Sequence, residues 1–326
     1  MCEVCDNITI NVNARQYDPT HTLTLRNAFV ADMNRRFNHI GKLVTKAVVE
    51  DDVFGLKENP IQILQSTPGT RAFAFNTNSQ KITAFLNWLR TVEDAVLLEL
   101  SSTNTSYGSF QQANWTSVYL AKAFQQGTTR AKQELKKAGI GVVLKDEFGM
   151  VYINPIAVSK LEVLFTRAFT DLKGITTTMD AQISRILAEG LIEGQSPIIL
   201  ARMINTAIIG GGETLALEIP YITKTGALSS YFMPGKRRAE ILARTEIIRA
   251  HHVATIQEYR NWEVEGVYVL AEWATAGDSR VCSICDGLQG SIWTLDEIEG
   301  MIPAHLQCRC VSIPFVDKTR TKVGGN

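Results

Sequence analysis

Five side chains that commonly bind metal lie near the carboxyl end of the chain. Cys282 and Cys285 are spaced C-x2-C, and His305, Cys308 and Cys310 follow as H-x2-C-x-C. Zn²⁺ takes four nitrogen or sulfur ligands in a tetrahedron, and structural zinc sites are usually two short ligand pairs separated by a gap of about twenty residues. We therefore predict a structural Zn²⁺ site that uses four of these five side chains.

The sequence leaves the ligand set open. The second pair is either His305 with Cys308 or Cys308 with Cys310, because residues two apart in an extended strand face the same side. A disulfide and unligated buried thiols are the alternatives to a metal. Residues 1–25 lack the apolar segment of a signal peptide, so we expect synthesis in a reducing cytoplasm, which favours metal over disulfide.

Composition limits the class of protein. The 326 residues predict about two domains, and 33 basic residues balance 33 acidic ones, so net charge gives no argument for nucleic-acid binding. Three local basic clusters, at 130–137, 236–238 and 318–322, are more typical of solvated surfaces. No apolar run approaches the roughly 18 residues of a membrane span, so we expect no membrane partner.

Hydrophobic periodicity predicts a helical region over residues 1–235, with a short strand at 7–13. The expected helices cover residues 22–49, 79–100, 115–124, 131–138, 154–169, 179–189 and 196–208. Ser79, Thr178 and Ser196 are the expected N-caps. The polar run 101–109 is expected to be a loop, and 213–235 an irregular connection that contains the domain boundary. A second C-x2-C pair, Cys2 and Cys5, is too isolated to predict a metal site.

Residues 236–316 are predicted to form a small β-rich domain, followed by a disordered polar tail at 317–326. A long helix is expected at 236–262, where His252 is a core histidine rather than a catalyst. The remaining elements are strands at 267–273, 291–293 and 308–315 and a capping box made by Thr294 and Glu297. A domain this small rarely forms a stable core without a disulfide or a bound metal, which is a second argument for zinc. The predicted fold class is α+β, mostly α.

Several short motifs occur in a fixed order in this part of the chain. They comprise Arg244-Thr245-Glu246, Trp273, Asp278 with Arg280, Cys282, Cys285 with Gly287, Pro303 with His305, and Cys308 with Cys310. This succession resembles the phage Mu F-like minor head proteins, a family of tailed-phage head morphogenesis proteins, over about residues 236–316. The segments 189–191 and 194–196 extend the resemblance weakly upstream.

The resemblance implies a non-enzymatic virion protein that is present in few copies inside the head, near the portal vertex. It implies roles in capsid assembly and in retaining or delivering DNA. Its expected partners are the portal protein or the inner capsid, with contact to packaged DNA and several copies per vertex, after assembly in the host cytoplasm. The long-helix residues Arg244 and Glu246 are expected to pair with Asp278 and Arg280 and so fix the cysteine loop on the helix.

Two other functions stay open at this point. A metal-dependent nuclease would need an open coordination position and a poised base, whereas the cysteine count favours a closed site and no acidic cluster suits two-metal chemistry. A DNA-binding protein without catalysis would depend on the local basic clusters, and its affinity would fall steeply with salt.

Overall fold

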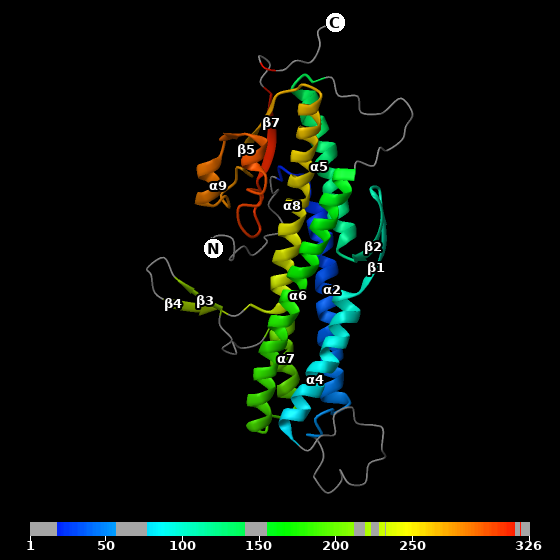
Figure 1. Ribbon diagram of the computed structural model, residues 1–326. Helices are drawn as coiled ribbons and strands as arrows, with labels where there is room; N and C mark the ends of the chain where they lie inside the picture. Colours follow the sequence, from blue (N-terminus) through cyan, green and yellow to red (C-terminus); the bar gives the residue numbers. More distant parts are fainter. Residues whose placement is uncertain are drawn as a thin grey trace. The chain divides into compact units, whose positions relative to one another are not determined.

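The computed structural model describes residues 18–56, 77–140, 155–211, 219–222, 228–231, 233–316 and 320, and the side chains of Gln112 and of 219–231 are not described. The chain divides into two compact units, and Figure 1 labels most of their helices and strands. The first unit contains Met1–Val30, Leu100–Phe169 and Ile241–Asn326, and the second contains Ala31–Glu99 and Thr170–Glu240. Each unit is assembled from separate stretches of the chain. Three of the boundaries between these stretches fall inside helices, namely α2 (Leu23–Thr45), α6 (Pro155–Ile192) and α8 (Gly235–Val264).

The second unit is built mainly from helices. It contains most of α2, its π-helical end η1 (Lys46–Glu50), α4 (Asn78–Glu93), η2 (Asp94–Leu98), the second half of α6 and α7 (Pro197–Ile208). On α2, Phe37, Ile40 and Val44 are fully buried at the predicted helical spacing. The predicted start of α7 is confirmed, because the Ser196 side chain accepts a hydrogen bond from Ile199 N and Pro197 follows it.

Two predicted N-caps are wrong. Helix α4 is capped by Thr77 rather than Ser79, because the Thr77 hydroxyl accepts from Gln80 N at 3.3 Å. Thr178 lies inside the 38-residue α6, where its hydroxyl donates to the carbonyl of Gly174 at 2.8 Å. The two helices predicted at 115–124 and 131–138 are likewise one helix, α5 (Ser117–Lys137).

Two segments that were predicted to be irregular contain hairpins. β1 (Leu100–Thr105) pairs with β2 (Gly108–Asn114) where a polar loop was expected. This hairpin buries Thr103, Phe110 and Ala113, and Gly108 supplies a positive φ of 119° at the turn. β3 (Ile219–Ile222) pairs with β4 (Leu228–Tyr231) within the predicted irregular connection.

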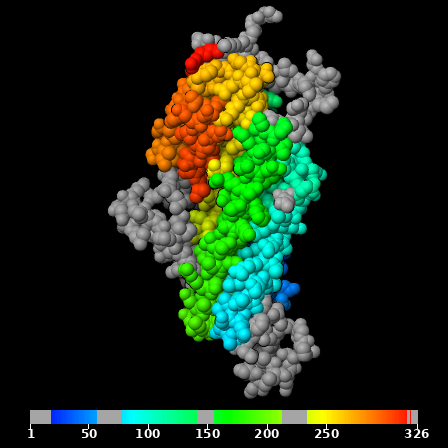
Figure 2. Space-filling view, viewed as in Figure 1, coloured from blue at the N-terminus to red at the C-terminus, as the bar shows by residue number. Residues whose placement is uncertain are grey.

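The carboxyl-terminal part of the first unit is a small sheet beside α8. Its strands are β5 (Val269–Ala274), β6 (Ile292–Trp293) and β7 (Val311–Val316), antiparallel in the order β6-β5-β7, and α9 (Ser283–Leu288) and α10 (Leu295–Ile298) lie in the connections. Val269, Ala271 and Trp273 alternate as buried residues, and the Thr294–Glu297 capping box is present as predicted. Figure 2 shows these elements, in orange to red, packed continuously against α8 in yellow.

The predicted fold class is confirmed, since the described part of the chain is mostly helical with small antiparallel sheets. The predicted division into domains at 1–235, 236–316 and 317–326 stays a prediction. The compact units divide the chain at other positions. The expected strand at 7–13, the Cys2–Cys5 pair and, apart from Arg320, the polar tail lie outside the described residues. Within the described ranges, no helix has both the length and the hydrophobicity to cross a membrane.

Candidate metal centre

Helix α9 positions the first cysteine pair. Cys282 is its N-cap, in extended conformation, and the Cys282 sulfur accepts a hydrogen bond from the backbone N–H of Cys285 at 3.5 Å. The C-x2-C segment is therefore the N-cap and first turn of a short helix. This geometry directs both sulfurs to the same region, and both cysteines are buried.

The loop before β7 supplies the remaining candidate ligands. Cys308 N donates to the carbonyl of His305 at 3.2 Å, and Gln307 between them has a left-handed φ of 60°. His305 Nδ1 lies 2.8 Å from the carbonyl oxygen of Leu306, and only a protonated Nδ1 can donate to that oxygen. The other ring nitrogen, Nε2, is then free of a proton and can act as a metal ligand.

The sulfur and nitrogen atoms lie at distances that suit a single cation. His305 Nε2 is 3.2 Å from Cys282 Sγ and 3.1 Å from Cys285 Sγ, and Cys285 Sγ is 4.0 Å from Cys308 Sγ. Two groups meet within 4.8 Å, one formed by Cys282, Cys285 and His305 and the other by Cys285, Cys308 and Cys310. Tetrahedral Zn²⁺ with bonds of about 2.0–2.3 Å would hold its ligand atoms roughly 3.3–3.8 Å apart, so the observed distances of 3.1–4.0 Å depart from that range by only about 0.2 Å at either end. The donor set therefore fits a zinc-sized ion.

The cysteines do not form a disulfide in the described part of the chain. All four are free thiols, and the 4.0 Å between Cys285 Sγ and Cys308 Sγ is about twice a disulfide bond length. Hydrogen bonds to Cys308 and Cys310, together with burial, raise the pKa of the Cys285 thiol. Several adjacent thiolates need a cation to neutralise them, so the crowding of these sulfurs is chemically consistent with a metal site.

The Arg244-Thr245 motif on α8 makes hydrogen bonds to the loop 305–308, which contains His305 and Cys308. The buried Thr245 hydroxyl accepts a hydrogen bond from Gln307 N at 3.0 Å and donates to the carbonyl of Ile241 at 2.8 Å. Arg244 Nη1 donates to Gln307 Oε1 at 3.0 Å. Both contacts end on Gln307, which lies between His305 and Cys308, so this motif positions two candidate ligands from outside the site.

Asp278 is paired differently from our prediction. Its carboxylate accepts two hydrogen bonds from Arg309, at 2.7 and 2.6 Å, and one from Arg280 Nη2 at 2.7 Å. Arg309 and Arg280 hold the pKa of Asp278 well below its usual range. Glu246 pairs instead with Arg249 at 3.0 Å and with Arg167 at 3.5 Å. The segment 278–285, which carries Cys282 and Cys285, is thus held through Asp278 by Arg309 rather than by Arg244 and Glu246 of the long helix. Arg309 lies between Cys308 and Cys310.

The other predicted motif residues have different surroundings. Trp273 and Pro303 are buried, and Trp273 belongs to the same hydrophobic core as the four cysteines. Gly287 has open space where a Cβ would lie, so nothing in the structure explains it. Sequence reasoning missed Arg309 and Gln307, although their positions between candidate ligands were a usable signal.

His252 is a core histidine, as predicted. Its Nε2 lies 3.1 Å from the carbonyl of Ile298 and its Nδ1 lies 3.2 Å from the Ser312 hydroxyl, so both ring nitrogens are occupied. Burial lowers its pKa to about 4. A buried neutral imidazole with both nitrogens bonded is poorly placed to act as a general base.

Fold and site together define a mostly helical protein with a small β-rich module in which four cysteines and a histidine form two groups that share Cys285. Residues 181–313 of this chain match the model of the family described as Phage Mu protein F like protein, which confirms the resemblance found in the sequence. The match begins upstream of residue 236 and therefore includes the segments 189–191 and 194–196. No curated protein and no solved structure matches the chain. The family indicates a phage head morphogenesis protein.

Proposed function

We propose that this protein is a minor head protein of a tailed bacteriophage. It acts in few copies inside the head near the portal vertex, where it contributes to head assembly and to retaining or delivering DNA. Its partners are the portal protein or the inner capsid, and it assembles from the host cytoplasm. The observation that carries the proposal is the family match over residues 181–313, which contains the candidate metal centre and the α8 motif that holds it.

The metal in this proposal is a structural Zn²⁺. A site built from buried cysteines and one histidine has enough protein ligands to fill four positions, which leaves no coordination site for a substrate. Bound zinc would neutralise the thiolates and link α9 to the loop before β7. The chain's own residues position the ligands, because Thr245 and Arg244 hold Gln307 while Arg309 holds Asp278.

Complementation of a phage that lacks this gene tests the proposed function. Wild-type protein supplied in trans should restore infectious particles, whereas Cys285→Ser should restore few because the module loses its metal. Ser283→Ala is the matched control, since Ser283 is an exposed neighbour on α9. Normal numbers of infectious, DNA-filled particles without any copy of the gene would contradict the proposal.

A further inference from the structure

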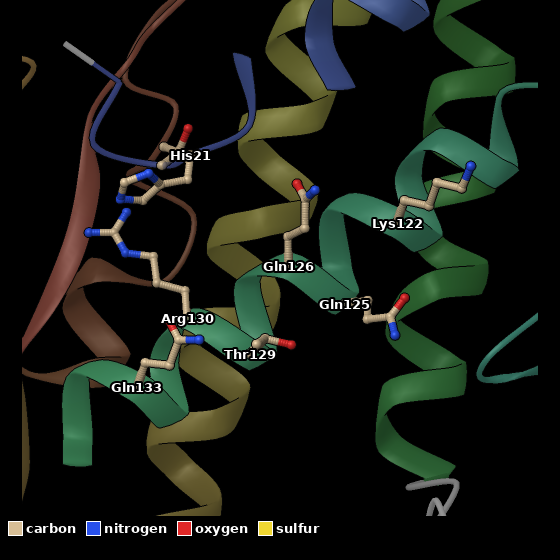
Figure 3. Close-up of a pocket in the computed structure, with 8 residues that line it drawn as sticks. His21, Lys122, Gln125, Gln126, Thr129, Arg130 and Gln133 are labelled. Atoms are coloured by element: carbon tan, nitrogen blue, oxygen red, sulfur yellow. The ribbon is translucent and has the colours of Figure 1, made fainter. Parts of the chain in front are cut away.

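A polar pocket of about 420 Å³ lies in the first unit, away from the cysteine cluster. It is lined by the turn that contains Thr20 and His21 and by one face of α5 (Figure 3). On α5, Lys122, Gln126 and Arg130 follow one another at intervals of four residues, so they lie along one side of the helix. These side chains offer cationic and amide donors along a single stripe.

The turn opposite α5 is held rigidly by Asp18. One Asp18 oxygen accepts from Leu23 N at 2.7 Å, and the other accepts from the Thr20 hydroxyl and from Arg26, each at 2.8 Å. His21 at its tip has a left-handed φ of 56°, a conformation that few non-glycine residues adopt. The network therefore fixes an exposed imidazole in a backbone conformation that the surrounding bonds must maintain.

The charges around the pocket favour an anion. Figure 3 shows the His21 ring facing the guanidinium group of Arg130, with Lys122 farther along the helix. None of the described lining residues is acidic; Glu134 forms an ion pair with Arg130 Nε at 3.8 Å but does not line the pocket. Asp18 is engaged by Arg26. Burial is the main cause that lowers the pKa of the neighbouring His251 to about 3, and the charges of Arg130, His252 and His21 lower it further.

We propose that this pocket binds phosphate groups, carried either by a nucleic-acid backbone or by a small phosphorylated molecule. Arg and Lys with amide and hydroxyl donors are the groups that contact phosphate oxygens. Every described lining side chain ends in a group that can donate a hydrogen bond, and none of them is acidic. The volume exceeds that of a single phosphate and suits a nucleotide-sized group. The inference does not depend on the proposed virion function.

Calorimetric titration of the full-length protein tests the inference, with inorganic phosphate, a nucleoside triphosphate and a short DNA duplex as separate probes. Arg130→Gln and Lys122→Ala should each weaken binding about tenfold, because each removes a charge-assisted contact. His21→Asn should weaken it less and keep the turn, since Asn tolerates the left-handed conformation. Lys136→Ala is the control, because Lys136 is an exposed cation of α5 that does not line the pocket.

The probes separate the two sources of phosphate. Binding of the duplex that is sensitive to Lys122→Ala would support a nucleic-acid backbone, and binding of the triphosphate alone would support a small molecule. Circular dichroism checks that the variants fold; Lys122 is exposed, so its replacement leaves the core intact. No binding of any probe at low salt, or equal losses in Lys122→Ala and Lys136→Ala, would overturn the proposal.

Discussion

Cys285 is the residue on which the candidate metal centre depends most, because its sulfur belongs to both ligand groups. Its backbone N–H also bonds to Cys282 Sγ, and its side chain lies within reach of His305 and Cys308. Replacing it should therefore disrupt the site whichever four ligands bind. The other cysteines belong to one group each and can discriminate between ligand sets.

We expect the purified protein to contain equimolar zinc and Cys285→Ser to contain almost none. Zinc retained by Cys310→Ser would identify His305 as the fourth ligand, whereas zinc lost by that variant would identify Cys310, because only a true ligand is needed for tight binding. Inductively coupled plasma mass spectrometry measures the metal, and Ser283→Ala is the control. Full zinc content in Cys285→Ser would contradict the metal centre. Chelation should lower the melting temperature of the wild type, because metal binding is coupled to folding.

Thr245→Val should destabilise the protein by about 1–2 kcal/mol, because it removes the buried hydroxyl that accepts from the Gln307 N–H while keeping the side-chain shape. Denaturant unfolding measures this change. Thr178→Val is the matched control: its hydroxyl bonds only within its own helix and is exposed, so we expect a change below about 0.5 kcal/mol. Equal effects of the two substitutions would contradict the role given to Thr245.

At this scale the candidate ligands could be predicted from spacing, but their supporting contacts could not. The short spacings in C-x2-C and H-x2-C-x-C bring the ligands within each motif close together, and the fold then brings the two motifs together. Sequence spacing could not predict whether Asp278 pairs with Arg309 or with Arg244, because it does not say how the loop that carries Asp278 is oriented. The structure selects Arg309, whose two nitrogens match both carboxylate oxygens.

At the scale of elements, Gly127 determines how closely α5 and α8 approach in the first unit. A Cβ at this position would lie 2.3 Å from the carbonyl oxygen of His251 and 3.0 Å from Ala254 Cβ. Both neighbours are on α8, and the carbonyl is backbone that cannot rotate away. The glycine is therefore required by helix packing and not by a special φ.

Gly127→Ala should destabilise the protein by about 1–3 kcal/mol, because the two helices must separate. Gly174→Ala provides the opposite case, since that glycine lies in α6 with open space around its Cβ position. There the alanine should stabilise the protein by about 0.5–1 kcal/mol through its better helix propensity. Thermal unfolding measures both, and a stabilising Gly127→Ala would contradict the close contact.

Long helices could be predicted well, whereas hairpins and caps could not. The spacing of Phe37, Ile40 and Val44 gives a helical period over many residues, so α2 was evident from the sequence. The 101–109 segment is rich in Ser, Thr and Asn, which suggested a loop, but packing of Phe110 against Phe165 and burial of Thr103 favour a hairpin. Tertiary burial of this kind overrides local composition.

At the scale of the whole molecule, the two units should respond oppositely to pH. In the first unit, burial lowers the pKa of His251 to about 3, so the unfolded chain takes up a proton below about pH 6.5 while the folded chain does not. Acid therefore destabilises this unit. In the second unit, burial, with Asp180 and Asp94, raises the pKa of Glu93 to about 9. The stability that its bound proton contributes is fully present below about pH 4.5 and is lost as pH rises towards 9.

Calorimetric unfolding between about pH 5 and pH 8 should accordingly show two transitions that move in opposite directions. Glu93→Gln should flatten the pH dependence of the second unit, because it removes the titrating carboxyl. Its exposed neighbour Asp94 offers the control substitution Asp94→Asn, which should change the slope much less. Identical slopes for wild type and Glu93→Gln would contradict the assignment.

The assignment to virus heads is tested most directly by counting copies of this protein in purified particles. Quantitative mass spectrometry with the portal protein as the internal standard gives that number. We predict a small, reproducible number of copies per particle, present in procapsids as well as in mature heads. Complete absence from both kinds of particle would contradict a minor head protein, and the candidate metal centre and the pocket beside α5 would then have to serve a function outside the virion.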